Sequence, residues 1–328
     1  MDSVARIKLI NKSFRGLLGN FLCHRRQMHF KKTPEQYLCP MKKILLAGAT
    51  GYLGSYILQE LMKQGFLIRV LIRNRSKLKM TEADAVEIME GEITRPGTIL
   101  NCCDQVDTVI STVGITRQRD GLTYLDVDYQ ANLNLLREAQ RSGVKKFIYV
   151  SVLHGQHLRK LKICEAKEKF VDELKSSGMA HCIIRPTGFF SDMSEYLNMA
   201  RKGRIFLFGN GRAKMNPIHG ADLAEVCVSA INSTITEIET GGPQLFTQTE
   251  IAGLAFNTLH KKVKITFLPI WLKKLILFIL RSLTSSKTYG PVEFVLTVLT
   301  MDMIAPVYGQ HTLNEYFKGL AGLKILPK

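Results

Sequence analysis

The chain has 328 residues and 46% of them are apolar, which is enough to bury the core of one domain with a smaller appended lobe. Its formal net charge of +17 suggests an anionic partner, but no nucleic-acid motif accompanies the charge and few aromatic residues lie among the basic ones. We therefore expect no nucleic-acid binding. The seven cysteines lack C-x-x-C spacing, so the sequence indicates neither a metal site nor a disulfide framework.

Residues 1–40 form a basic extension with eight Lys or Arg and only two acidic residues, Asp2 and Glu35. We expect the fold to begin at Met41, directly before the first strand. The composition fits a mitochondrial or plastid transit peptide, a disordered extension, or a start codon assigned upstream of the true one. These alternatives stay open, and without a transit peptide we expect a cytoplasmic protein.

The segment 43–54 joins a short apolar strand to three glycines with the spacing G-x-x-G-x-x-G. Gly48 permits a tight turn, Gly51 lets the backbone approach a pyrophosphate, and Gly54 lets the next helix pack closely on the sheet. The helix expected over 55–65 then directs its N-terminal amides at the phosphates. The residues predicted to bind the cofactor here are Gly48, Thr50, Gly51, Tyr52, Leu53 and Gly54.

A second strand, expected over 66–72, completes a βαβ unit. It is followed by Arg73, Arg75 and Lys77, with no carboxylate at the position where NAD-binding sites hold the ribose. This pattern favours a 2′-phosphate, and hence NADP, with Arg73 and Arg75 as the predicted ligands. A solvated basic loop is the alternative for each residue.

Strands and helices continue to alternate along the chain. Strands are expected over 85–89, 106–114, 146–151 and 182–186, with a short helix over 98–103 and an amphipathic helix over 126–143. The pattern predicts an α/β fold with a doubly wound parallel sheet, a Rossmann domain over 41–240 and a mostly helical substrate lobe over 241–328. Ligands bind at the carboxyl ends of such strands. The candidates there are Thr112, Val113, Gly114, Ser151, Pro186 and Phe189.

These motifs resemble the atypical short-chain dehydrogenases/reductases of the NmrA-like branch, and among them the divinyl chlorophyllide 8-vinyl reductases and their relatives. The resemblance implies a Rossmann fold, a bound NADP and either reductase activity or a non-catalytic role. The segments that carry it are 48–54, 128–132, 146–151, 166–167, 185–190, 207–211 and 217–222.

The family's catalytic Tyr-x-x-x-Lys pair is incomplete, because Lys167 is present but Ile163 stands at the tyrosine position. The resemblance implies that Lys167 binds the nicotinamide ribose and serves catalysis, whereas by local sequence alone it is an exposed helix lysine. Two functions stay open. One is an NADPH-dependent reductase of an apolar or conjugated small molecule, and the other is a redox sensor or assembly factor. His154 is a weaker proton-donor candidate, and His219 and Asp222 are interpreted as structural.

An apolar helix is expected over 270–283, interrupted by three cations and too short to span a bilayer, which takes ~20 apolar residues. We expect it to pack in the core or as a lid against a second apolar segment, 292–301. A peripheral membrane contact through 270–283 is the alternative. An apolar lid implies an apolar substrate. The sequence leaves the oligomeric state open.

Overall fold

The computed structural model of the protein describes residues 42–78, 85–115 and 121–322. The basic extension suggested for residues 1–40, and its targeting alternatives, lie outside the described residues. Within the described ranges no helix is both long and apolar enough to cross a membrane.

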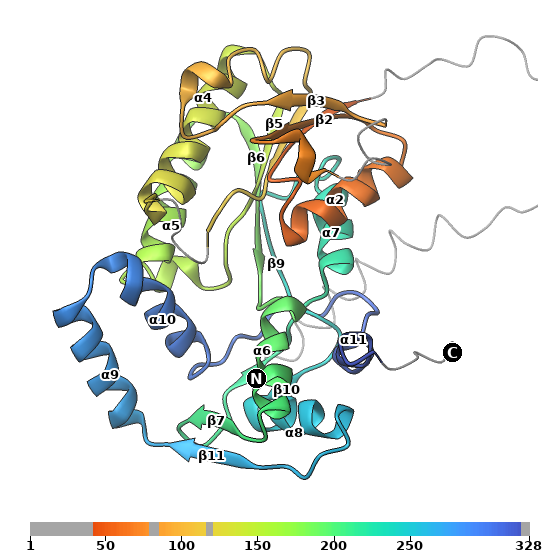
Figure 1. Ribbon diagram of the computed structural model, residues 1–328. Helices are drawn as coiled ribbons and strands as arrows, with labels where there is room; N and C mark the ends of the chain where they lie inside the picture. Colours follow the sequence, from red (N-terminus) through yellow and green to blue (C-terminus); the bar gives the residue numbers. More distant parts are fainter. Residues whose placement is uncertain (1–41, 79–84, 116–120, 323–328) are drawn as a thin grey trace, which may run out of the picture. The chain divides into compact units, whose positions relative to one another are not determined.

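The centre of the fold is a parallel sheet. Its strands are β1 (Lys43–Ala47), β2 (Leu67–Ile72), β3 (Glu87–Glu90), β4 (Thr108–Ser111), β5 (Lys146–Val150), β6 (Ala180–Pro186) and β9 (Glu237–Thr240). Within the described residues these seven strands run in the order β3-β2-β1-β4-β5-β6-β9 (Figure 1). The order reverses beside β1, which pairs with both β2 and β4. The predicted doubly wound fold is therefore confirmed, and the switch point lies at the end of β1.

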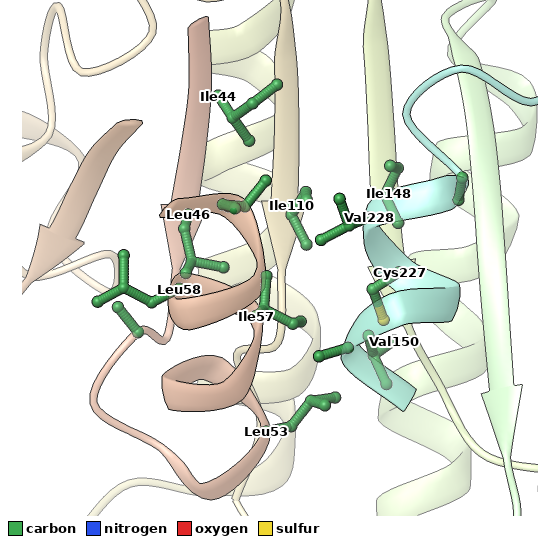
Figure 2. Close-up of a cluster of buried hydrophobic side chains, with 14 of the residues drawn as sticks. Ile44, Leu46, Leu53, Ile57, Leu58, Ile110, Ile148, Val150, Cys227 and Val228 are labelled. Carbon is green, nitrogen blue, oxygen red and sulfur yellow. The ribbon is translucent and has the colours of Figure 1, made fainter. Parts of the chain in front are cut away.

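Helices cover both faces of the sheet. On one face lie α2 (Tyr52–Lys63) and α7 (Gly220–Ser229), and on the other α4 (Asn132–Arg141) and α5 (Lys162–Ser176). Figure 2 shows the first face, where side chains of β1, β4 and β5 meet those of α2 and α7. Because successive side chains of a strand point to opposite faces, a strand buried on both sides is almost entirely apolar, as β1 is.

The short helix expected over 98–103 is not formed. A single 3₁₀ turn at Pro96–Thr98 is followed by irregular turns, and Asn101 has a φ of 65°, a left-handed value that interrupts a helix. The side chains of Cys102 and Cys103 are buried under the sheet instead. Core packing thus overrides the local helical pattern.

The amphipathic helix expected over 126–143 begins as a π-helical segment, Leu125–Ala131, and continues as α4. Asp128 and Asn132 are fully buried in it. The Asn132 side-chain amide donates to the Val113 carbonyl over 3.2 Å. The segment therefore directs two polar side chains at the chain that leaves β4, and π-turns often mark functional sites.

A smaller lobe has its own core, built from segments on both sides of residue 240. A parallel pair, β7 with β11, and an antiparallel pair, β8 with β10, belong to it. The elements are α6 (Phe190–Arg201), β7 (Ile205–Phe208), β8 (Lys214–Met215), β10 (Phe246–Thr247), α8 (Gln248–Thr258), β11 (Ile265–Leu268) and α11 (Leu313–Leu320).

Two further helices, α9 (Ile270–Leu283) and α10 (Ser286–Val298), pack on each other, and α10 also contacts α5. The helix expected over 270–283 is present with those bounds. The expected packing against the second apolar segment is present, but α9 does not lie in the core, because Leu277 is its one buried residue. The second apolar segment covers only one side of it.

Candidate functional site

The glycine turn joins β1 to α2 at the switch point of the sheet. Gly48 has a φ of 90°, which favours glycine, and the Gly51 amide donates to the Gly48 carbonyl over 3.0 Å. A Cβ on Gly54 would lie 2.0 Å from the Gly48 oxygen, so the helix packs directly on the turn. A Cβ on Gly51 would meet only that same oxygen, at 3.3 Å. The geometry matches the roles expected of Gly48 and Gly54, and it leaves space beside Gly51.

The other residues of the turn are oriented differently from one another. Thr50 is exposed, whereas Leu53 is buried in the core and offers a ligand only its backbone. The Tyr52 hydroxyl accepts a hydrogen bond from the Gly220 amide over 3.2 Å, and the Tyr52 ring packs on Phe189 at 5.8 Å. Since the first amides of a helix have no partner within it, the start of α2 presents backbone donors to an anion.

The basic loop lies at the carboxyl end of β2. Arg73, Arg75 and Lys77 are exposed, and in the described part of the chain none of these side chains forms an ion pair with a carboxylate. Asn74 stabilises the loop, because its side-chain oxygen accepts from the Ser76 amide over 2.8 Å. The loop is thus ordered while its cations remain available to a phosphate.

One carboxylate lies beside this loop that the sequence did not place there. Glu90, at the end of β3, accepts a hydrogen bond from the Arg75 backbone amide over 3.1 Å. The parallel register that aligns Ile72 with Glu90 brings it to the loop, and this register cannot be read from either strand alone. This hydrogen bond involves the Arg75 backbone and not the Arg73 side chain.

The chain leaving β4 passes close to the switch point. The Thr112 hydroxyl donates to the Ala47 carbonyl over 3.2 Å, which ties the ends of β1 and β4 together. A Cβ on Gly114 would lie 2.6 Å from Asp128 Oδ1 and 2.8 Å from Lys167 Nζ. Glycine is therefore needed where the backbone crosses these two side chains.

Lys167 forms an ion pair with Asp128, and 2.9 Å separates Nζ from Oδ1. The Lys167 side chain is 13% exposed and Asp128 is fully buried, so Lys167 is not a solvated surface lysine. Tyr149 also lies beside this ammonium, with its ring centroid 5.5 Å from Nζ. The i, i+4 spacing of Asp128 and Asn132 is the signal that could have revealed this partner, since it places both on one helix face.

The electrostatics keep Lys167 protonated. Burial alone would lower its pKa, but the Asp128 carboxylate and Tyr149 outweigh burial and raise the pKa above its ordinary value. Burial raises the pKa of Asp128, with the Lys167 ammonium and the Ile115 amide opposing that rise. The pKa of Tyr149 is also raised, mainly by burial, so its phenol stays neutral. The Asp128 carboxylate therefore stabilises the charged form of Lys167.

Ser151 and Pro186 are buried. The Ser151 hydroxyl donates to Glu168 Oε1 over 2.8 Å, and Arg185 pairs with both oxygens of Glu168 at 2.6 and 2.8 Å. Arg185 also contacts Glu237 and is 1% exposed. Arg185 therefore belongs to a buried network that joins β5, α5 and β6.

A protein-family model described as NAD(P)H-binding matches residues 48–234, more than half of the chain. The chain belongs to this NAD(P)H-binding family. The glycine turn and the amides of α2 fit a dinucleotide. The absence of a Cβ at Gly54 lets α2 pack on the turn, and space remains beside Gly51 for a phosphate. The family also agrees with the short-chain dehydrogenase/reductase resemblance.

Individual proteins share only about a quarter of their residues, or fewer, with this chain. The chain is 25% identical to the photosystem II assembly factor Ycf39 of Trieres chinensis, over 71% of this chain and 74% of that protein. It is 24% identical to the chloroplastic divinyl chlorophyllide a 8-vinyl-reductase of Zea mays, over 86% and 81%. An NADPH-dependent quinone oxidoreductase from Escherichia coli, solved with NADPH, has a TM-score of 0.64 at 18% identity over 85% and 99%. That likeness shows a shared fold.

Ile163 of this NAD(P)H-binding protein lies in an apolar cluster with Leu161 and Cys164, against which Phe294 of α10 packs. Burial raises the pKa of Cys164 to about 12, so the thiol is neutral at physiological pH. His154 lies half-buried in a turn, with its ring 6.4 Å from that of His157. At the position of the family's tyrosine, this chain therefore has a buried apolar side chain that packs against its neighbours.

A cavity of about 290 Å³ lies beside the start of α7 and contains a histidine that the sequence analysis missed. His311 Nδ1 lies 2.6 Å from Asp222 Oδ1, and its ring stacks on that of His219 at 4.3 Å. His219 Nδ1 accepts from the Ala221 amide over 3.2 Å and thereby caps the helix. Burial, and then His311, lower the pKa of His219 to about 4. His219 and Asp222 have the structural contacts expected of them.

Proposed function

We propose that this protein is an NADPH-dependent reductase of an apolar or conjugated small molecule, with Lys167 at the reacting centre. The observation that carries the proposal is the ion pair of Lys167 and Asp128 beneath Gly114, at the carboxyl end of the sheet. Buried ionisable groups with strongly perturbed pKa values occur often at functional sites, and this ion pair therefore supports a reacting centre there. Bound NADPH would supply a hydride.

The residues of this chain would bind the cofactor and orient its reacting end. The turn from Gly48 to Gly54 would hold the pyrophosphate, and Arg73 would hold the 2′-phosphate. Lys167, kept cationic by Asp128, would donate to the ribose next to the nicotinamide and order a water beside it. That water is the proposed proton source, because Ile163 replaces the phenol.

Cofactor preference can be tested at Arg73. Arg73→Asp should weaken NADPH binding at least about tenfold and leave NADH binding unchanged or stronger, because a 2′-phosphate would then face a carboxylate. Calorimetry with both nucleotides measures this. Arg137→Asp makes the same charge change at an exposed position of α4 and serves as the control. Equal affinities of the parent protein for NADPH and NADH would contradict the assignment.

Catalysis can be tested at the ion pair. The double variant Lys167→Met/Asp128→Asn removes both charges and so avoids leaving one buried charge unpaired. We expect it to unfold at nearly the parent temperature but to oxidise NADPH at least about a hundredfold more slowly with an enone or quinone panel. Parent-like turnover in this variant would remove Lys167 from the mechanism.

A second candidate function is a non-catalytic NADP-binding redox sensor or assembly factor. Ile163 in its apolar cluster favours it, since this side chain can neither donate nor accept a proton where the family's tyrosine acts. Similarity to an assembly factor is in keeping with it. Tight NADPH binding without NADPH oxidation by any acceptor of the panel would favour this candidate over the reductase.

A further inference from the structure

The helix α9 exposes its apolar side. Trp271, Leu275, Phe278 and Ile279 follow the spacing i, i+4, i+7, i+8 and so form one stripe along the helix. Their exposed fractions are 63%, 44%, 68% and 44%. A surface helix of a globular protein normally turns such a stripe toward the core. Here it faces away, at the periphery of the described fold (Figure 1).

The opposite side of α9 is anchored to α10, which determines how the helix is rotated. Lys273 Nζ donates to Thr300 Oγ1 over 2.6 Å, just beyond the end of α10. Arg281 pairs with Glu293, which is 3% exposed, and Leu277 is buried on the same side. Turning the apolar stripe inward would break these contacts and leave the buried Glu293 carboxylate without its Arg281 partner. The exposed stripe is therefore a stable feature of the fold.

The surrounding sequence is strongly basic. Residues 251–292 contain seven Lys or Arg and no Asp or Glu. Lys262 and Lys264 are exposed at the start of β11, Lys274 is exposed on α9, and Phe267 of β11 adds another exposed apolar ring. Apolar and cationic groups thus occur together on one continuous stretch of chain.

We propose that α9 is an interfacial helix that docks this protein on a membrane surface rich in anionic lipid. Its apolar stripe would lie among the acyl chains near the headgroups, with the neighbouring lysines against the lipid phosphates. A second copy of the chain fits less well, because its equally basic segment would be brought against this one. The proposal is independent of the reductase function.

Trp271 is the only tryptophan in the chain and therefore reports on the stripe directly. The test is to add phosphatidylcholine/phosphatidylglycerol vesicles to the full-length protein and to follow Trp emission and co-sedimentation. We expect a blue shift together with co-sedimentation. Vesicles of phosphatidylcholine alone should bind at least about tenfold more weakly, and so should the mixed vesicles in high salt.

Variants localise the contact. Leu275→Gln/Phe278→Gln keeps the Trp271 probe and changes only exposed side chains, so it should fold normally and bind mixed vesicles at least about tenfold more weakly. Val307→Gln, a change at an equally exposed apolar residue outside α9, is the control and should bind like the parent. No blue shift and no co-sedimentation with mixed vesicles would overturn the proposal. A lipid-free, concentration-dependent blue shift with dimer formation would also overturn it, in favour of a second copy.

Discussion

Alanine at Gly51 should weaken NADPH binding and alanine at Gly54 should weaken the fold, although the two glycines lie in the same turn. At Gly51 the backbone has a φ of −81° and a ψ of 170°, which alanine adopts without strain. The new Cβ would meet only the Gly48 oxygen, at 3.3 Å. At Gly54 the Cβ would lie 2.0 Å from the same oxygen and 2.7 Å from the Gly48 carbonyl carbon.

These distances determine the expected free energies of unfolding. At Gly51, reduced freedom of the unfolded chain contributes about 0.4–1 kcal/mol, and the poorer helix N-cap costs a similar amount, so stability should change by less than about 1 kcal/mol. At Gly54 the clashing atoms are backbone and cannot move cheaply. Gly54→Ala should therefore lose roughly 1–3 kcal/mol or more.

Urea unfolding measures the two stabilities, and calorimetry measures NADPH binding. Gly51→Ala should remain folded but bind NADPH at least about tenfold more weakly, a loss of about 1.4 kcal/mol, because its methyl group occupies the space left for the pyrophosphate. Unchanged NADPH affinity in Gly51→Ala would show that the phosphates bind elsewhere. Parent-like stability in Gly54→Ala would show that α2 is not packed on the turn as described.

Two further predictions concern buried charge. Because burial and then His311 lower the pKa of His219 to about 4, below its unfolded value of 6.5, the unfolded chain binds the proton more readily and stability falls as the pH drops from about 6.5 toward 4. His219→Asn keeps a capping side chain that does not titrate. Between pH 7 and pH 5 it should therefore lose less stability than the parent, and the difference should stay below about 2 kcal/mol because the His219 ring is partly exposed. Urea unfolding at both pH values measures this, and equal losses of stability in the variant and the parent would refute it. Glu168→Gln should cost about 3 kcal/mol of unfolding free energy, since it takes the bidentate carboxylate away from the buried Arg185 and leaves the partly exposed Glu237 as its charged partner. Glu165→Gln, at an exposed pair on the same helix, should cost less than about 1 kcal/mol, and thermal unfolding that shows equal shifts for the two variants would contradict the role of burial.

Most of the sheet could be predicted because its signals are local. Apolar runs such as β1, followed by glycines and a helical period, specify a βαβ unit from neighbouring residues alone. The errors arose where packing overrode that local pattern. The segment 98–103 resembles a helix, but Asn101 takes a left-handed φ so that two cysteines can enter the core.

The candidate site was predictable in part for the same reason. The glycine turn and the cations after β2 follow directly in the chain from the strands that position them. Asp128, Glu90 and His311 were missed as site residues because each meets its partner through a long-range contact. Glu168 directly follows Lys167 in the sequence, but nothing in the neighbouring residues indicates that Glu168 pairs with Arg185.

The sequence by itself determined the parallel Rossmann sheet and its dinucleotide turn, because periodicity and glycine spacing act over a few residues. Only the tertiary structure decided which carboxylate neutralises Lys167 and which way α9 faces. A helical period shows that a helix has an apolar stripe, but whether any other element covers that stripe depends on contacts between distant segments. For α9 the cover is one-sided, and the stripe stays exposed.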